Sequence, residues 1–233
     1  MLPVSVIIPV KDEPNINKIV QQLHIVLSDV EHEIIVVYGD KSRSPPVVSN
    51  AVVFKIYGDS LERAILSGFS VAKHENMVVM DGDGSHPPQI VPGLLSKLEH
   101  SDLVIASRYL KGGSAGHMSP YRRIVAKTFK KTANVLGVRV SDPMAGFFAL
   151  KKKTLEGMQF KPIKWKVLFE ILSKKGHELK VEEVPYTYER RAIGRSKTSS
   201  RIALTIIKDM LLTSKKMKTI PQVALTILLL IVI

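Results

Sequence analysis

The strongest constraint on the fold is an alternation of short β-branched runs with segments of helical spacing over residues 1–100. Alternation of this kind predicts a mostly parallel, doubly wound α/β sheet with helices on both faces. In that architecture ligands bind at the carboxyl ends of the strands, so the residues after each run are the first candidates for a site. Strand-like runs occupy residues 4–9, 33–37, 52–56 and 77–80, and helical spacing occupies residues 15–27, 60–72 and 89–98.

The later part of the chain continues this pattern and then becomes more amphipathic. We expect a strand at residues 103–106, a Gly-, Ser- and Pro-rich loop at 111–120, a basic amphipathic helix at 121–136 and a late strand at 179–188. Residues 200–212 mix apolar and basic residues, which is typical either of a helix in a membrane interface or of core packing. Residues 221–233 carry no charge, but at 1.5 Å per residue they reach only about 20 Å, short of the roughly 30 Å hydrocarbon layer.

Positive charge is concentrated after residue 100. The net charge is +13, yet residues 1–100 hold 8 Lys and Arg against 12 Asp and Glu. Residues 108–141 contain eight basic residues and no acidic one. Such blocks attract nucleic acid or an anionic membrane surface, although a solvated basic face is the simpler interpretation.

The chain contains no cysteine, which excludes a disulfide framework and thiolate metal sites. The residues after Met1 lack the basic start, apolar stretch and cleavage site of a signal peptide. We therefore expect a cytosolic amino terminus and a reducing compartment.

Two carboxylates one residue apart, Asp81 and Asp83, follow the fourth strand-like run in a glycine-rich turn. Such carboxylates present oxygen ligands to Mg²⁺ or Mn²⁺ and leave coordination positions open for phosphate oxygens, as a nucleotide diphosphate requires. A calcium loop is excluded because its sixth place is His86 rather than Gly and its twelfth is Pro92 rather than Glu. On its own an Asp-Gly-Asp turn is more often structural than catalytic.

Five ordered segments carry a resemblance to a known family. The chain resembles the inverting family 2 glycosyltransferases, and among these the dolichyl-phosphate mannose synthases, in order over nearly its whole length to about residue 200. The segments are VIIPVKDE at 6–13, VVMDGDGSHPP at 78–88, SRYLKGG at 107–113, SDPMAGFFAL at 141–150 and EVPYTYERRAIGRSK at 183–197. The resemblance implies a GT-A-type Rossmann-like fold with C-terminal amphipathic or interfacial helices.

The resemblance also implies roles for individual residues. Those on the donor side are Pro9, Lys11 and Glu13 for the base and ribose, Asp81, Gly82 and Asp83 for the donor, and Asp81, Asp83 and Ser85 for the metal. Lys11 replaces the aromatic residue that is usual in the family. Arg108 and Arg122 would face the acceptor phosphate, while Arg191, Lys197 and Lys166 would bind the donor diphosphate. Asp142, Pro143 and Gly146 are interpreted first as turn geometry.

The activity implied is transfer of a sugar, mannose from GDP-mannose, to dolichyl or polyprenyl phosphate with inversion, using Mg²⁺ or Mn²⁺. We expect a catalytic domain at 1–200, a basic interfacial helix at 201–218 and an apolar tail at 219–233 that can begin a membrane segment. This arrangement implies association with the cytoplasmic face of a membrane. Three lysines, Lys215, Lys216 and Lys218, precede the tail on that side.

Alternatives remain because Tyr38-Gly39-Asp40 stands where the family has paired aspartates, so recognition of the base either moves to Asp40 or is lost. The runner-up is a UDP-glucose:polyprenyl-phosphate glucosyltransferase, and a catalytically impaired membrane-associated homologue is the third candidate. A nucleic-acid binder would leave the acidic turn without a role, and no stacking pattern of aromatic residues lies among the cations. A dinucleotide oxidoreductase would need a Gly-x-Gly-x-x-Gly turn after the first strand, and residues 9–14 contain none.

Overall fold

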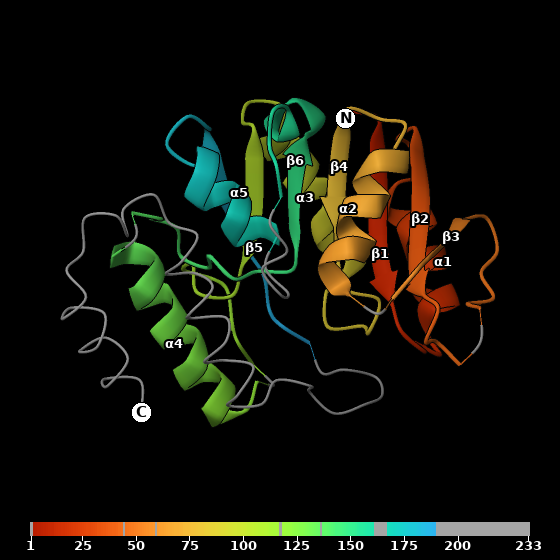
Figure 1. Cartoon of the computed structure of the whole chain (residues 1–233), viewed down its shortest axis with the longest axis horizontal. Helices are drawn as coiled ribbons and strands as arrows, with labels where there is room; N and C mark the ends of the chain where they lie inside the picture. Colours follow the sequence, from red (N-terminus) through yellow and green to blue (C-terminus); the bar gives the residue numbers. More distant parts are fainter. Residues whose placement is uncertain are drawn as a thin grey trace.

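The structure is a computed structural model that describes residues 2–43, 45–58, 60–116, 118–135, 137–160 and 167–189 (Figure 1). The strands are β1 (Val4–Val10), β2 (His32–Gly39), β3 (Val52–Ile56), β4 (Asn76–Val79), β5 (Leu103–Ser107), β6 (Phe148–Lys151) and β7 (Val181–Pro185). The helices are α1 (Ile16–Val26), α2 (Leu61–Val71), α3 (Val91–Leu98), α4 (Pro120–Val135) and α5 (Val167–Lys175), with short 3₁₀ turns at Pro88–Ile90 and Lys152–Leu155.

Within the described residues the strands form a 7-stranded sheet in the order β3-β2-β1-β4-β6-β5-β7. β1 pairs in parallel with β2 and β4, β2 with β3, and β5 with β7. β6 runs antiparallel between β4 and β5. The expected mostly parallel sheet is therefore confirmed, and the parallel strands all end at the same edge of the sheet.

β1 shows why these residues form a central strand. All of its residues are buried, as expected of a near-continuous apolar run covered on both faces. Its pairing with β4 ends at Ile7, whereas its pairing with β2 continues through Pro9 and Val10. Pro9 has no N–H to donate, and it lies beyond the end of the β4 ladder, where a proline is tolerated.

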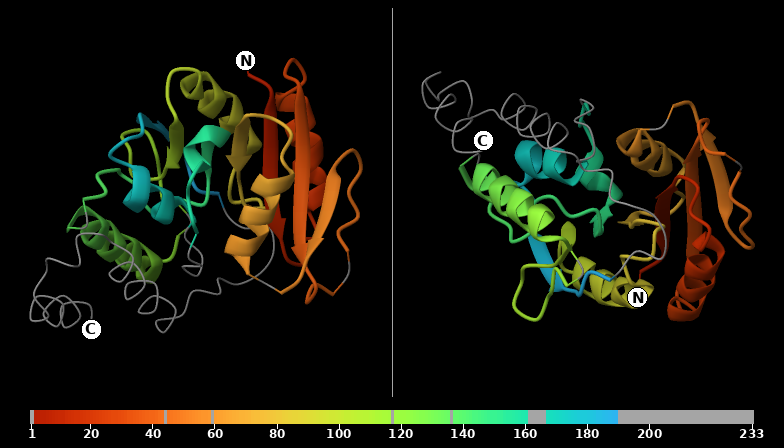
Figure 2. Two further views of the ribbon diagram at one scale, coloured as in Figure 1. Left: turned by 45° about the horizontal axis from the view of Figure 1, so that its top comes forward. Right: turned by 90° about the horizontal axis from the view of Figure 1, so that it is seen from below.

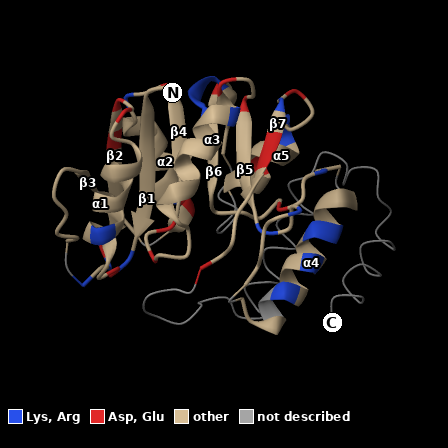
Figure 3. Cartoon of the chain, turned by 180° about the vertical axis from the view of Figure 1, so that it is seen from behind, with Lys and Arg blue, Asp and Glu red and all other residues tan. Residues whose placement is uncertain are grey.

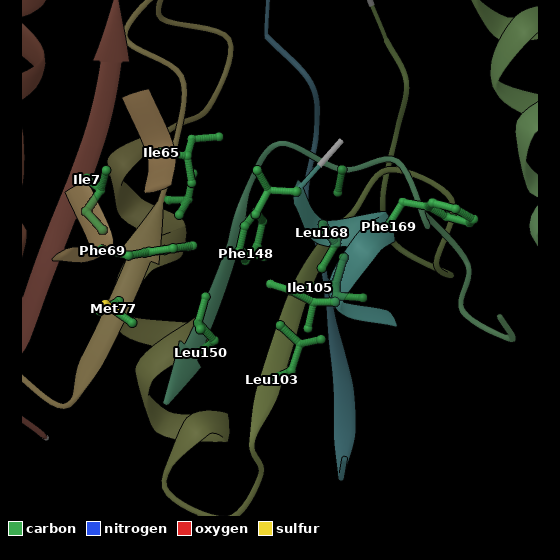
Figure 4. Close-up of a cluster of buried hydrophobic side chains, with 14 of the residues drawn as sticks. Ile7, Ile65, Phe69, Met77, Leu103, Ile105, Phe148, Leu150, Leu168 and Phe169 are labelled. Atoms are coloured by element: carbon green, nitrogen blue, oxygen red, sulfur yellow. The ribbon is translucent and has the colours of Figure 1, made fainter. Parts of the chain in front are cut away.

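Helices cover both faces of the sheet, as Figure 2 shows from below. On one face, α2 and α5 pack on alternate strand residues such as Ile7, Leu103 and Ile105 (Figure 4). On the other face, α1 and α3 pack on the residues between them, including Ile8 and Val104. Alternation of this kind along each strand gives two apolar layers, which hold the sheet edge in place.

The sequence expectations for the strands and helices up to residue 136 are confirmed within a few residues, and the late strand is shorter than expected, at Val181–Pro185. The sequence does not predict β6 or α5, and a short apolar run such as that of β6 does not distinguish helix from strand by periodicity. The expected helix at 200–212 and the apolar tail lie outside the described residues. Among the residues that are described, no helix has the length and apolar character needed to cross a membrane.

Candidate active site

The acidic turn directly follows β4 at the carboxyl edge of the sheet, as the sequence predicts. Met80, which donates its N–H to the carbonyl of Ile7, is the last residue held by β1, and Asp81 follows it. The side chain of Asp81 is 31% exposed, whereas Asp83 is buried with 8% exposure. The two carboxylates therefore differ in environment although they lie one residue apart.

Asp83 is held by the residue two positions later. Its Oδ1 atom accepts hydrogen bonds from the backbone N–H of Ser85 at 2.9 Å and from the Ser85 hydroxyl at 2.6 Å. Ser85 is fully buried. Ser85 can therefore orient the carboxylate of Asp83 through these two hydrogen bonds. Its role as a metal ligand remains a prediction.

Gly82 brings the acidic turn close to β1 and α1. A Cβ atom at this position would lie 2.7 Å from Cγ1 of Val10 and 3.1 Å from Cγ2 of Ile8. A larger residue would push the turn away from the sheet edge. The observed role of Gly82 is thus close packing, and its contact with a nucleotide remains a prediction.

The loops after β1 and β2 meet at the same edge. Asp12 has a left-handed φ of 58°, and its Oδ1 atom accepts the backbone N–H of Arg43 at 2.7 Å. Asp40 is exposed, and its Oδ1 atom accepts the backbone N–H of Gly58 at 3.0 Å. Lys11 and Glu13 are half-buried beside this junction. The structure thus places Lys11, Glu13 and Asp40 at the same edge of the sheet as the acidic turn, and their function remains a prediction.

Arg108 follows β5 and forms a bidentate ion pair with Asp142. Nε lies 2.7 Å from Oδ2 and Nη2 lies 2.8 Å from Oδ1, with side-chain exposures of 11% for Arg108 and 2% for Asp142. Burial by itself lowers the pKa of the Arg108 guanidinium, but the charge and hydrogen bonds of Asp142 more than offset this and raise it above its ordinary value. Arg108 is therefore a fixed cation.

A second polar network fixes the loop that contains Asp142. The carboxylate of Glu183, on β7, accepts the backbone N–H of Ser141 at 2.9 Å and its hydroxyl at 2.5 Å. The hydroxyls of Ser141 and Ser107 are in contact, and the Ser107 hydroxyl accepts the N–H of Tyr109 at 3.1 Å. These bonds connect the end of β5, β7 and the loop before β6.

Buried aromatic side chains connect the acidic turn with the Arg108–Asp142 pair. The ring of His86 stacks on Phe147 with centroids 4.9 Å apart, and the edges of Tyr186 and Tyr188 lie against it. The guanidinium of Arg108 lies 5.9 Å from the ring centroid of Tyr188. Burial raises the pKa of the Tyr186 hydroxyl, with Asp142 and Asp81 acting in the same direction, so it stays protonated.

Several expected site residues cannot be placed. Arg122 lies in α4, but only its backbone is described, and Lys166, Arg191 and Lys197 lie outside the described residues. The chain is described as far as Glu189, whose backbone N–H donates to the carbonyl of Ser85 at 3.2 Å. Glu189, the last described residue, is thus tied to the acidic turn.

Three contributions to this region do not follow from the sequence alone. In the sequence His86 argues only against a calcium loop, Asp142 fits a turn, and Tyr186 and Tyr188 carry no assigned role. The spacing of the two tyrosines was a usable signal, because residues two apart on an extended segment share one face. The pairing of Asp142 with Arg108 spans 34 residues and has no local signal.

The carboxylates of Asp81 and Asp83 suit a divalent ion such as Mg²⁺ that also binds the phosphate oxygens of a substrate. Among the described residues, no three His, Asp, Glu or Cys side chains form a cluster able to hold a metal ion by themselves. Mg²⁺ is commonly bound by one or two carboxylates together with substrate phosphates, which matches the turn at Asp81 and Asp83. Gly146 lies beside this turn, since a Cβ there would be in van der Waals contact with Oδ1 of Asp81 at 3.6 Å.

The chain is similar in sequence to enzymes named dolichol-phosphate mannosyltransferase and polyprenol monophosphomannose synthase. It is 35% identical over 216 residues to the dolichol-phosphate mannosyltransferase of Pyrococcus furiosus, which covers 86% of this chain and 60% of that protein. It is 34% identical over 158 residues to the enzyme of that name from Saccharomyces cerevisiae, covering 64% and 59%. The polyprenol monophosphomannose synthase of Mycolicibacterium smegmatis is 36% identical over 152 residues, covering 60% and 56%. The chain thus spans about 60% of the length of the first two relatives.

Solved structures share the fold at low sequence identity. Mannosyl-3-phosphoglycerate synthase from Rubrobacter xylanophilus superposes with a TM-score of 0.73 at 18% identity, covering 95% of this chain and 77% of that one. Glucosyl-3-phosphoglycerate synthase from Mycobacterium tuberculosis, in complex with Mn²⁺, UDP and phosphoglyceric acid, gives 0.68 at 19% identity, covering 94% and 80%. Residues 5–158 match the sequence pattern of "Glycosyl transferase family 2", and the chain therefore belongs to this family.

Proposed function

We propose that this chain is the catalytic domain of an enzyme that transfers mannose from GDP-mannose to a dolichyl or polyprenyl phosphate, with inversion at the anomeric carbon. The observation that carries the proposal is the pair Asp81 and Asp83 at the carboxyl edge of the sheet, beside the loops after β1 and β2. The names of the relatives support a mannosyl donor and a polyprenyl phosphate acceptor.

Asp81 and Asp83 would hold a Mg²⁺ or Mn²⁺ ion, which when bound neutralises the diphosphate that leaves the sugar. Asp81 is the more exposed of the two, and Asp83 is oriented by Ser85. Mn²⁺ and UDP bound to a structural neighbour support this assignment. Arg191 and Lys197 would add positive charge at the diphosphate, supported by the bond that ties Glu189 to the turn.

The acceptor phosphate would be the nucleophile. A phosphate monoester with a second pKa of about 6 is largely ionised at neutral pH, so no general base is required. Arg108 would contact this phosphate while Asp142 keeps its guanidinium in one orientation. Because arginine has about five N–H donors, contact with the acceptor does not require the ion pair to break.

The acceptor is a lipid, and α4 is suited to a membrane surface. Figure 3 shows Lys and Arg along α4, and its sequence contains no acidic residue. Phe129 packs into the core, while Arg123, Lys127 and Ile124 are exposed, Ile124 by 65%. A basic helix with exposed apolar residues is attracted to anionic lipids, which supports membrane association at the cytoplasmic face.

A UDP-glucose-dependent transferase is the second candidate. Tyr38-Gly39 replaces the paired aspartates of the family, and Asp40 is exposed and bonded to Gly58. UDP-glucose is also bound in a solved structure that shares the fold. A catalytically impaired homologue is the third candidate, and it predicts no transfer from any donor.

The test is a panel of radiolabelled GDP- and UDP-sugars incubated with the purified chain, Mn²⁺ and polyprenyl phosphate in phospholipid vesicles. We expect label in the lipid fraction from GDP-mannose and its loss with EDTA. Transfer from UDP-glucose alone would favour the second candidate, and no transfer from any donor would reject the enzymatic proposal.

Asp83→Asn keeps an oxygen that can accept from Ser85 but removes the charge, so we expect turnover to fall by about 100-fold or more. Asp29→Asn is the matched control, because Asp29 is exposed in the turn between α1 and β2 at the opposite edge of the sheet. Turnover of Asp83→Asn within a few-fold of the control would contradict the assignment of the metal site.

A further inference from the structure

The imidazole of His86 is buried at the centre of the candidate site. Its exposure is 3%, its ring stacks on Phe147, and the rings of Tyr186 and Tyr188 lie nearly perpendicular to it at 5.9 and 6.4 Å between centroids. These aromatic rings come from the loop before β6 and the segment after β7. The orientation of the imidazole is therefore fixed by packing from two other parts of the chain.

The nitrogens of His86 both face Asp81. The backbone N–H of Asp81 donates to Nδ1 at 2.8 Å. A ring nitrogen that accepts a hydrogen bond carries no proton, so the proton of the neutral ring is assigned to Nε2. Nε2 lies 3.8 Å from Oδ2 of Asp81, longer than a hydrogen bond but close enough for electrostatic attraction.

Gly146 borders both His86 and Asp81. A Cβ at this position would lie 3.5 Å from Cε1 of His86 and 3.6 Å from Oδ1 of Asp81. The glycine therefore packs against the imidazole and the carboxylate together. His86 contacts both the backbone N–H and the carboxylate of Asp81. It therefore restricts the main-chain and the side-chain torsions of Asp81 together.

We propose that His86 is a positioning residue that fixes the backbone and carboxylate of Asp81 in the orientation that binds the divalent cation and the donor diphosphate. This inference rests on the proposed function, since it assigns Asp81 to that site. Residues that hydrogen-bond to or pack against a metal ligand orient it before the metal arrives, and their loss commonly costs about 10–100-fold in metal affinity or activity.

The test compares two substitutions at the same position. His86→Phe keeps a ring that can stack on Phe147 but leaves the Asp81 N–H without its acceptor. His86→Asn keeps an oxygen near the place of Nδ1, so it restores the acceptor but not the ring. His100→Phe is the matched control, because His100 is exposed in the turn between α3 and β5.

The first readout needs no metal. Hydrogen–deuterium exchange of the peptide that contains Asp81 is expected to speed up in His86→Phe and to recover in His86→Asn. Unchanged exchange in His86→Phe, with circular dichroism like that of the parent, would overturn the proposal. If His86→Phe fails to fold, slow exchange at Asp81 in His86→Asn supports the proposal, and exchange at the unprotected rate contradicts it.

The second readout is Mn²⁺ binding in the presence of GDP, followed by electron paramagnetic resonance. We expect His86→Phe to weaken Mn²⁺ binding about 10-fold or more, and His100→Phe to leave it unchanged. In an Asp81→Asn background the effect of His86→Phe should largely disappear, because both substitutions act on the same ligand. Additive effects would overturn the positioning role.

Transfer activity separates this inference from the proposed function. A parent chain that binds Mn²⁺ and GDP but transfers no sugar rejects the proposed function, and the binding cycle at His86 and Asp81 still decides the positioning role. A parent that transfers sugar, with His86→Phe equal to it in Mn²⁺ affinity and turnover, rejects the positioning role alone.

Discussion

The ion pair between Arg108 and Asp142 allows a stability prediction worked from its geometry. Asp142→Ala removes two short contacts of 2.7 and 2.8 Å from a side chain that is only 11% exposed. Removing one partner of a buried pair costs about 3–5 kcal/mol, because the remaining charge stays buried without compensation. Some solvent reaches Arg108, so we expect the lower end, a loss of about 3 kcal/mol in the free energy of unfolding.

Urea unfolding followed by circular dichroism measures this loss. With a slope of about 3 kcal/mol per molar urea for a domain of this size, the midpoint should fall by about 1 M. Asp142→Asn keeps one acceptor oxygen, so its urea midpoint should fall less than that of Asp142→Ala. The double variant Arg108→Met/Asp142→Ala removes both charges and should be no less stable than Asp142→Ala alone.

Two results would refute this reasoning. A midpoint for Asp142→Ala within about 0.3 M of the parent would mean that the pair contributes less than about 1 kcal/mol. Additive losses from Arg108→Met and Asp142→Ala would mean that the two side chains act independently, despite their bidentate contact.

Three further results are expected. A hydrogen bond from Lys153 lowers the pKa of Asp102, so the carboxylate stabilises the fold above about pH 4. This contribution is lost as pH falls through the lowered pKa. The difference in Tm between the parent and Asp102→Asn should therefore shrink between about pH 5 and pH 2. Gly68→Ala should lower stability by about 1–3 kcal/mol in urea unfolding, because its Cβ would lie 2.3 Å from Cγ2 of Ile7, and a gain would show that the helix shifts freely. Arg122→Ala should raise the KM for polyprenyl phosphate more than that for the donor, and equal changes in steady-state kinetics would count against an acceptor role.

Most of the fold could be predicted because its signals are local. β1 is a run of buried residues, and α2 is capped by Ser60, whose hydroxyl accepts the N–H of Arg63 at 3.3 Å. The position of β6 could not be predicted, because its antiparallel place between β4 and β5 depends on pairing partners distant in sequence. A four-residue run carries too little periodicity to specify that pairing.

The candidate site was predictable where one motif holds several functional groups and unpredictable where two distant segments meet. Asp81 and Asp83 lie in one turn, and the rule that ligands bind at carboxyl ends places them at the sheet edge. Asp142 looked like a turn residue because Pro143 follows it. Only the folded chain brings Asp142 to Arg108. The cation that the sequence predicts at Arg108 is therefore neutralised by an ion pair.

That neutral pair has a consequence for how an anionic acceptor would be attracted. Arg108 and Asp142 together carry little net charge, so their field falls off quickly with distance. α4 carries basic residues with no acidic residue among them, and Arg123, Lys127 and Lys131 are exposed. If the acceptor is a lipid phosphate, as proposed, its long-range attraction would come from α4, and Arg108 would supply a fixed contact at short range. Added salt should therefore weaken vesicle binding, because screening acts on exposed charges, and should affect the buried pair far less.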